Sequence, residues 1–595
     1  MDTTPIQDQI SKTTDCIRVL LANMRTAGYV SSTDLIPSLR SFDCLLLETS
    51  AFVRSSINSV APVNRLPPEV LSVIFSMASL TSFSPGYPRR PEGQYQSAQI
   101  LHTQIMRVCR HWRGVAQSAT SLWSDIVCRP QKGASLSSQI QRAQTTFIGV
   151  YSEGDVKPLI PVLSEHVHRI RRLHVRTMDN HWITANPRIK AVFATLPKMA
   201  LHIEELVLHP WSVDWTSPTA SLFSGSAPRL RVLSLHELSF VPTDHFPNLQ
   251  KLFITLQRPP EQAELLTMLQ GSPMLEHVHI WAPRVVPHPG GTPNGRAARL
   301  PHLRAMVLCL GHDTPCLLSD LVLPPSCLVR LQLEDAPLDE VPLCLAALEK
   351  HLDARPLTKL SWSQGIGMGF MARRAVLYVT LCNAAADAGL QIGVSLRGYV
   401  RAREASADVF RRAFDTCPLY AHVTDLSVSA KRNLVDFTIL DSLHSLTTIN
   451  HIFAPTPSPR LSHMGARTRR RRRDTTRVPS LARAGPDGAL ACPALHTLYF
   501  IDCGAAELRD VRTILQARMA AGLPLARLGV DCSARFREDA RALRELVDEL
   551  DVAITDEPGY EEFKWRAGEP EGGWRSHSAR ARYEWPRCQI VEITM

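Results

Sequence analysis

The chain has 595 residues and a mass of 66.2 kDa, which is too long for one ordinary globular core and predicts several domains or an extended array of repeats. Hydrophobic residues make up 45% and charged residues 21%, which excludes a protein that is disordered overall, and 43 Pro with 6% aromatic residues indicate short elements separated by turns. The formal net charge is +10, but seven Arg and one Asp within 467–477 supply +6 of it, which weakens the case for a nucleic-acid-binding protein.

The 14 Cys are scattered, with no CxxC pair and no His pair at a matching spacing. This pattern predicts reduced thiols and no zinc site. No stretch approaches the ~20 apolar residues of a membrane span, and the first residues carry an early acid and no apolar leader segment. We therefore expect a soluble protein of the cytoplasm, the nucleus or both, with no membrane partner.

Residues 1–60 are predicted to be helical. Apolar residues such as Ile10, Ile17 and Leu20 fall near helical spacing, a turn follows at Gly28, and a second apolar run passes through 45–47. A helical hairpin or a short coiled coil fits this pattern. Dimerisation through it remains an alternative to plain packing within the chain.

The stretch 64–127 contains two further predicted helices. In NRLPPEVLSVIFSMASL, Pro67 and Pro68 can occupy a first helical turn without loss of a hydrogen bond, and one apolar face is expected to hold Val70, Leu71, Ile74 and Phe75. In QIMRVCRHWRGVAQ, a single helical stripe is expected to hold Ile105, Val108, Cys109, Trp112 and Val115. A polar Pro/Gly-rich stretch near 82–97 separates the two helices and is predicted to be a solvated loop.

The order LPPEVLSVIF, VCRHWRGVA and SLWSDI resembles the F-box, in which an LP dipeptide opens a helix, a V-C-x-x-W helix follows and an L-W pair closes the module. The resemblance implies that residues at these positions bind the SKP-type adaptor of a cullin ubiquitin ligase or hold the helices that do. The residues at matching positions are Leu66, Pro67, Ile74, Phe75, Val108, Cys109, Trp112 and Trp123. The alternative is a small hydrophobic helical domain with no partner.

From residue 165 onward, apolar residues recur at i, i+3 and i+5, usually after a turn that contains Pro. The eleven occurrences begin at residues 170, 203, 230, 249, 275, 303, 328, 357, 423, 495 and 525. From 170 to 357 the intervals run from 19 to 33 residues and bracket the period of ~20 to 29 of leucine-rich repeats. Each occurrence is predicted to be a short strand that buries its i+3 and i+5 residues by stacking on its neighbours. The units resemble irregular leucine-rich repeats, with helical segments expected at 263–269 and 536–550.

These patterns predict an α+β protein, with N-terminal helices and a small helical F-box module followed by a leucine-rich-repeat-like α/β solenoid. The expected organisation is an N-terminal helical segment at 1–60, the F-box module at 61–128, a repeat body at 129–453, a disordered Pro/Arg-rich insert at 454–490, C-terminal repeats with a helix at 491–555 and an irregular tail at 556–595.

Motifs for chemistry are weak. GIGMGF at 365–370 has GxGxG rather than GxGxxG spacing, so a turn within the repeats is favoured over a dinucleotide loop. The sequence has no P-loop, HExxH or GxSxG motif. We therefore expect no catalytic residues, no metal site and no cofactor, and interpret the chain as a protein that is not an enzyme.

The run Arg469, Arg470, Arg471, Arg472 and Arg473 permits three interpretations: a nuclear-import signal, a phosphate-binding patch, or a solvated loop without a partner. No aromatic residue interrupts it, which argues against base stacking and makes a nucleic-acid partner unlikely by sequence.

The F-box resemblance implies a substrate-recognition subunit of an SCF-type cullin-RING ubiquitin ligase. The module would bind the adaptor, and the repeat body would bind an unknown protein substrate. Two alternatives stay open at this stage: an F-box scaffold that delivers no substrate, and a nucleic-acid-associated repeat protein that uses the Arg-rich insert.

Overall fold

The computed structural model describes residues 4–26, 35–81, 104–128, 133–153, 156–176, 185–209, 221–287, 297–311, 313–333, 340–352, 357–368, 373–383, 389–395, 420–429, 440, 443–452, 480–482 and 490–554. Within it the chain divides into two units, Met1–Leu122 and Trp123–Met595. The predicted loop near 82–97 and the predicted tail at 556–595 lie outside the described residues, as does all but a few residues of the predicted insert at 454–490.

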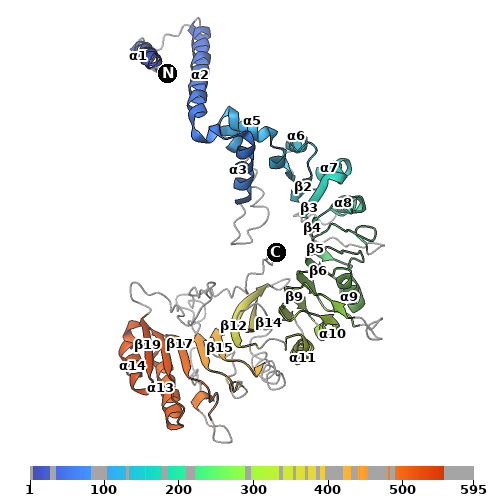
Figure 1. Cartoon of the computed structure of the whole chain (residues 1–595), viewed down its shortest axis with the longest axis vertical. Coiled ribbons are helices and arrows are strands. Elements are labelled where there is room, and N and C mark those ends of the chain that lie inside the picture. The colour runs from blue at the N-terminus through green and yellow to red at the C-terminus, as the bar shows by residue number, and fades with distance from the viewer. Residues whose placement is uncertain are drawn as a thin grey trace, which may run out of the picture. The chain divides into compact units, whose positions relative to one another are not determined.

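The first unit is helical. Its helices are α1 (Thr4–Thr26), α2 (Leu35–Val60), α3 (Pro68–Thr81), a short helix at 104–108 and α5 (Arg110–Ser118), with 3₁₀ turns at Pro62–Arg65 and Thr120–Trp123. Pro68 begins α3 because its missing N–H would have no partner in a first turn, and Glu69 adds a favourable charge there. The helices predicted for 1–60 are therefore present, as two long helices (Figure 1).

Within the described residues, the second unit is built on one mostly parallel sheet of 17 strands. In chain order the first strands are β1 (Asp125–Cys128), β2 (Ile148–Glu153), β3 (Ile170–Arg176), β4 (Glu205–His209), β5 (Val232–Leu238), β6 (Lys251–Leu256), β7 (His277–Ala282), β9 (Ala305–Leu310) and β11 (Leu328–Leu333). They pair in that order, all in parallel. A separate two-stranded ladder joins β8 (Ala298–Arg299) to β10 (Leu321–Val322).

Among the described strands of this sheet, the pairing order changes once, after β11. The next strands are β12 (Lys359–Met368), β13 (Arg373–Cys382) and β14 (Gly389–Ser395). β14 pairs with β11, β13 lies antiparallel between β14 and β12, and β12 pairs with β15. The parallel order then resumes through β15 (Asp425–Ser429), β16 (Thr448–Ile452), β17 (Thr497–Cys503), β18 (Arg527–Cys532) and β19 (Glu549–Ile554).

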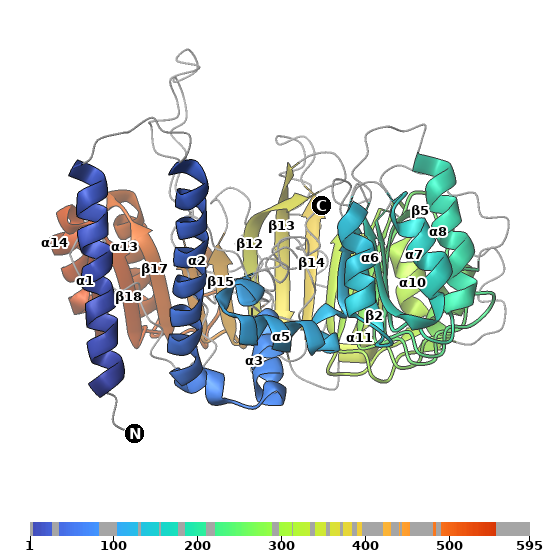
Figure 2. The same ribbon diagram turned by 90° about the horizontal axis from the view of Figure 1, so that it is seen from above.

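Helices lie along one face of this sheet. They are α6 (Gly133–Arg142), α7 (Leu159–His166), α8 (Ala185–Met199), α9 (Gln262–Gln270), α10 (Thr314–Ser319), α11 (Glu340–Leu352), α13 (Ala505–Ala520) and α14 (Arg537–Arg541). Figure 2 shows α13 and α14 beside β17 and β18, which they contact. Helix α13 stops where Gly522, with φ of +73°, adopts the left-handed conformation that favours glycine.

The core sits between the strands and these helices, and it contains the residues that the i, i+3, i+5 pattern selects. Leu206 and Leu208 of β4 are buried, for example, while Glu205 and Val207, which alternate with them, are only partly buried. All eleven predicted segments fall on strands, and 263–269 falls on α9, as predicted. The strand alternation places the i+3 and i+5 side chains on one face of the sheet.

Two local predictions were wrong. The segment 536–550 was expected to be one helix, but α14 ends at Arg541, a 3₁₀ turn covers Arg544–Leu546, and β19 begins at Glu549. The residues 365–368 of GIGMGF continue β12 rather than forming a turn. In both cases pairing with a neighbouring strand overrides the local preference.

Candidate adaptor interface

Helix α3 presents two apolar faces. Leu71 and Phe75 are 0% and 2% exposed and point into the first unit. Val70, Val73, Ile74 and Met77, by contrast, are between 41% and 59% exposed. The single apolar face expected from the sequence is thus divided between core and surface. The four exposed residues, which we call the α3 patch, leave apolar area in water that a partner helix could bury.

Trp112 of α5 fixes the inner side of this helix. Its ring centroid lies 5.0 Å from that of Phe75, in a tilted arrangement. Its indole Nε1 donates a 2.5 Å hydrogen bond to Asn64 Oδ1, and Asn64 Nδ2 donates to the carbonyl of Asn58 at the end of α2. Asn64 therefore joins α2, the 3₁₀ turn and α5, a role that the sequence analysis did not assign.

Cys109 interrupts the predicted second helix. It is extended, with φ of −158°, and caps α5 because its Sγ accepts a hydrogen bond from the backbone N–H of Trp112. The expected single stripe over 105–115 is therefore wrong in its continuity. Ile105 and Val115 are buried, whereas Val108 is 52% exposed. Val108 is therefore an exposed apolar residue of the module outside the α3 patch.

Leu66 and Pro67 form the entry to α3. Leu66 is half-buried, and its N–H donates to the carbonyl of Val63. Pro67 is exposed, and its carbonyl accepts the hydrogen bond of the Leu71 N–H, which starts the helical ladder. These two residues therefore set where α3 begins, and Pro67 also adds to the exposed surface.

Trp123 lies in the second unit. Its side chain is 6% exposed, and the guanidinium carbon of Arg142 in α6 lies 4.7 Å from the centroid of its ring. Ile126, three residues later, is wholly buried in β1. Trp123 is therefore a core residue of the sheet unit.

The model of the F-box-like family matches residues 63–129. This segment is an F-box-like module. It contains all eight residues at the predicted F-box positions, so the F-box part of the sequence resemblance is confirmed, while the likeness to leucine-rich repeats stays a prediction. A search of curated proteins finds no match to the chain.

The α3 patch is suited to binding an apolar partner. Its four residues are aliphatic side chains and Met, which neither transfer protons nor act as nucleophiles. Over the described part of the chain, no group of three or more His, Cys, Asp or Glu side chains is arranged to hold a metal ion. Among the described helices, none has the length and apolarity needed to cross a membrane.

Beyond the F-box-like module, histidines gather on the sheet face that the helices do not cover. His209 of β4 and His236 of β5 lie with ring centroids 4.3 Å apart, and His279 of β7 approaches Cys309 of β9 with Nε2 3.8 Å from Sγ. Burial lowers the pKa of His209 and of His279 to about 4 and that of His236 to about 3, and nearby Arg176 and Arg330 add to the effect. The three rings are thus neutral at physiological pH.

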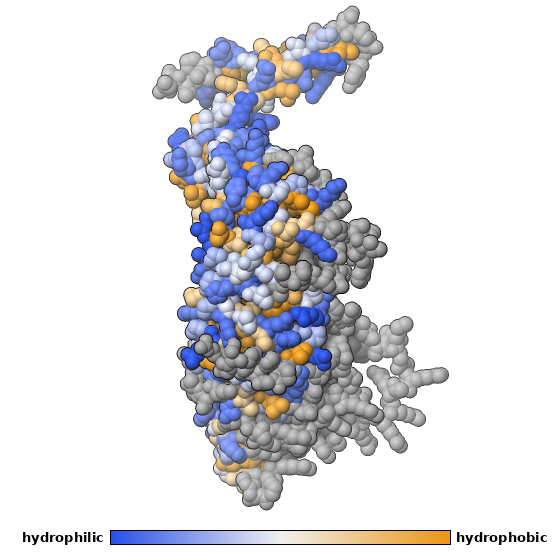
Figure 3. Space-filling view, turned by 90° about the vertical axis from the view of Figure 1, so that its right-hand side faces the viewer, coloured by the Kyte–Doolittle hydropathy of each residue, from blue (hydrophilic) through white to orange (hydrophobic). Residues whose placement is uncertain are grey.

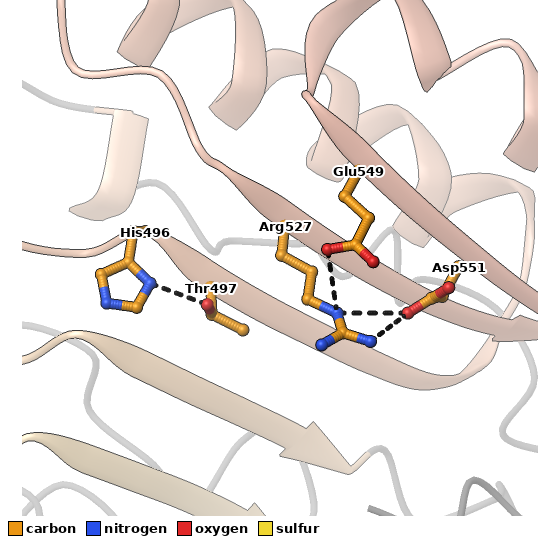
Figure 4. Close-up of polar contacts among 5 residues, drawn as sticks. All are labelled: His496, Thr497, Arg527, Glu549 and Asp551. Carbon is orange, nitrogen blue, oxygen red and sulfur yellow. Dashed lines mark hydrogen bonds and ion pairs between the residues drawn. The ribbon is translucent and has the colours of Figure 1, made fainter. Parts of the chain in front are cut away.

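A charged cluster lies on the last strands of the sheet, β17 to β19 (Figure 4). Arg527 Nη2 of β18 lies 2.7 Å from Asp551 Oδ2 of β19, and Glu549 is 3.8 Å away from Arg527 Nε. The hydrogen bond with Asp551 raises the pKa of Arg527 above its usual range. His496 and Thr497 are hydrogen-bonded alongside, in line with Arg527 across the β17–β18 pair. This cluster offers a polar surface rather than an apolar one.

The run Arg469 to Arg473 lies outside the described residues, so its three interpretations remain predictions.

Proposed function

We propose that the chain is a substrate-recognition subunit of an SCF-type cullin-RING ubiquitin ligase. The observation that carries this proposal is the F-box-like module at residues 63–129, since F-box domains typically bind SKP-type adaptors. F-box proteins are generally adaptors without catalytic activity, which accords with the expectation that this chain is not an enzyme. No cofactor is needed for such a role.

The proposed adaptor contact is centred on the α3 patch. Val70, Val73, Ile74 and Met77 would be buried by the adaptor, with Pro67 and Val108 as further exposed contacts. Four partly or wholly buried residues would contribute indirectly, because they hold α3 and α5 in place. These are Leu66, Phe75, Cys109 and Trp112. Trp123 would act only as a core residue of the sheet unit, which begins within the module.

The proposed target contact is the sheet face that the helices leave uncovered. A stack of short parallel strands with periods near those of leucine-rich repeats supports a repeat solenoid, in which exposed strand residues can vary without cost to the core. The target is proposed to be a protein. The chain would bring this protein close to a conjugating enzyme that carries ubiquitin. A cytoplasmic or nuclear location, with import through Arg469 to Arg473, belongs to the same proposal.

The adaptor contact is tested by co-purification of the full chain with a SKP-type adaptor. Ile74→Asp should abolish recovery of the adaptor, because a carboxylate would be buried in an apolar interface. The matched control is Val322→Asp in β10, since Val322 is 42% and Ile74 41% exposed, and this variant should bind as the unaltered chain does. If the unaltered chain binds no adaptor, or if both variants lose it equally, the proposal fails.

Target delivery is tested separately. Deletion of the gene should lengthen the half-life of a protein that co-purifies with the sheet unit. Expression of the unaltered chain should shorten that half-life again, whereas expression of the chain with Ile74→Asp should not. Binding to the adaptor without any such change would favour a scaffold. A salt-sensitive interaction with RNA or DNA that needs Arg469 to Arg473 would favour a nucleic-acid-associated protein instead.

A further inference from the structure

Helices α1 and α2 leave an unusual amount of apolar side chain in water. Twelve of their described large apolar residues are at least 43% exposed. These are Ile10, Val19, Leu20, Leu21, Ile36, Leu39, Leu45, Leu47, Phe52, Val53, Ile57 and Val60. Figure 3 shows the same feature, as apolar residues gathered on the helices at the top of the view. Isolated helices gain most of their stability from packing of such a face, so these two need a covering partner.

Both helices carry a heptad seam. In α1 the seam runs through Ile10, Thr13, Ile17 and Leu20, at the alternating spacing of three and four residues that defines heptad positions a and d. In α2 the corresponding seam consists of Leu39, Phe42, Leu46, Thr49, Val53, Ser56 and Val60. Each seam has a single threonine within its central part, so the two helices present related patterns of apolar and polar layers.

The charges are partitioned away from the α1 seam. Lys12 pairs with Asp8 at 2.7 Å, and Arg18 pairs with Asp15 at 3.2 Å, and none of the four residues occupies a seam position or a position directly beside the seam. The positions beside the seam in described α1 are Gln9, Thr14, Cys16, Leu21 and Asn23, none of which is charged. A strongly acidic or basic partner helix would find no complementary charge there. An apolar helix of the same kind fits better.

One covering helix is not enough for α2. Besides its seam, apolar residues flank both sides: Leu45 and Phe52 on one side, Ile36 and Ile57 on the other. In α2 a single charge, Asp43, lies beside the seam. A neighbour packed on a seam covers the seam and at most one flank, whereas a helix within a four-helix bundle has a broad apolar face toward two neighbours. Packing of α1 on α2 within one chain would leave one flank exposed.

The exposed area is of the size that a stable dimer requires. A large apolar side chain has on the order of 100 Å² of surface to bury, so the eleven other than Val19, which are about half exposed, supply on the order of 550 Å² per copy. A standard protein interface buries about 800 Å² per partner. Helices of 23 and 26 residues are about 35 and 39 Å long, and can provide this area along their lengths.

We propose that α1 and α2 dimerise the protein by forming a four-helix bundle with the same two helices of a second copy. The dimer carries two F-box-like modules and two sheet units. Binding at one copy then raises the effective concentration of its second copy near the same assembly. This inference does not depend on adaptor binding, and it survives if the adaptor proposal fails.

The test is the mass of the purified full chain, measured by light scattering and sedimentation over a range of concentrations. The unaltered chain should have twice the mass of 66.2 kDa. Ile10→Asp places a carboxylate in the seam and should raise the dimer dissociation constant at least ~100-fold. The matched control is Val19→Asp, because Val19 is 60% and Ile10 61% exposed but Val19 lies on the opposite side of α1. This control should change the constant by less than about threefold.

The double variant Ile10→Ala, Val53→Ala is a milder change that should preserve the helices. Circular dichroism should show unchanged helix content, while the dimer dissociation constant rises by at least ~10-fold. Three results would overturn the proposal: an unaltered chain that stays monomeric at tens of micromolar, a mass corresponding to three or more copies, or equal weakening by Ile10→Asp and Val19→Asp. Adaptor binding of the same variants, measured in parallel, keeps this outcome separate from that of the F-box-like module.

Discussion

The two units use their apolar residues in opposite ways. The helical unit leaves Val73, Met77 and much of α1 and α2 exposed, whereas the strands of the sheet unit bury side chains such as Leu206, Leu233 and Leu252 completely. The difference separates two kinds of effect. Substitutions on the helical unit's surface should alter association with little cost in folding, and substitutions in the sheet unit's core should do the reverse.

The largest expected effect is on the sheet unit, at Arg518 of α13. Its side chain is wholly buried and donates hydrogen bonds to the carbonyls of Ala491, Cys492 and Leu495. Arg518→Met should lower the free energy of unfolding by about 3 to 5 kcal/mol, because three buried carbonyls lose a charged donor. Urea denaturation measures this loss, with exposed Arg512→Met on the same helix as control. Equal losses for both variants would contradict the prediction.

The next effect contrasts two neighbours on α3. Leu71→Ala removes a wholly buried side chain and should cost about 2 to 4 kcal/mol, seen as faster hydrogen exchange in α3 and α5. Ile74→Ala, at a site 41% exposed, should cost less than about 1 kcal/mol but weaken adaptor binding about 10- to 30-fold. If Leu71→Ala weakened adaptor binding but left hydrogen exchange in α3 and α5 unchanged, the division of α3 into a core face and a surface face would be wrong.

That division also marks what the sequence could and could not predict. Helical spacing selects Val70, Leu71, Ile74 and Phe75 as neighbours on α3, but it does not indicate that Leu71 and Phe75 are the buried pair, of which Phe75 packs against Trp112. The bond from Trp112 to Asn64 joins residues 48 apart in sequence, and no local pattern indicates it. The break at Cys109 depends on a thiol accepting a backbone N–H, which helical periodicity does not predict.

In the sheet unit the spacing i, i+3, i+5 located strands well, because each strand repeats the same burial pattern. In this sheet it missed β1, β2, β13, β14 and β16, and the beginning of β19 was predicted to be the end of a helix. The antiparallel β13 lies outside the repeat, and β19 is the last strand of the ladder, where the sequence 549–554 alternates weakly. Such strands form because a neighbour offers a free edge, which is not a local property.

The histidines of the sheet face give a pH-dependent comparison. His209, His236 and His279 have folded pKa values of about 4, 3 and 4, below the ordinary value of 6.5, mainly because burial disfavours the charged form. Unfolded chains therefore take up protons first as the pH falls. The free energy of unfolding is therefore unaffected by these histidines above about pH 6.5, and it decreases as the pH falls from there toward 4 and 3.

At pH 5 this loss should amount to about 1 to 2 kcal/mol per histidine, measured as the free energy of unfolding of the sheet unit at pH 7.5 and pH 5. His236→Gln should reduce the slope, although it also changes the contact of Ser234 Oγ with the His236 ring. Exposed His168→Gln is the control and should leave the slope unchanged. If the sheet unit is equally stable at both pH values, these three rings are not held neutral by burial.

The smallest effect is expected where the sheet unit resembles an ordinary protein surface. Arg527 and Asp551 are each about one third exposed, so water and salt screen their charges despite the 2.7 Å contact. Asp551→Asn should cost less than about 1 kcal/mol and the cost should shrink in 0.5 M salt. Glu549→Gln is the matched control at 3.8 Å and should cost less still. If Asp551→Asn lowered the free energy of unfolding by several kcal/mol, this end of the sheet would depend on charge rather than on its apolar core. The contrast between exposed apolar residues in the helical unit and buried ones in the sheet unit would then not account for its stability.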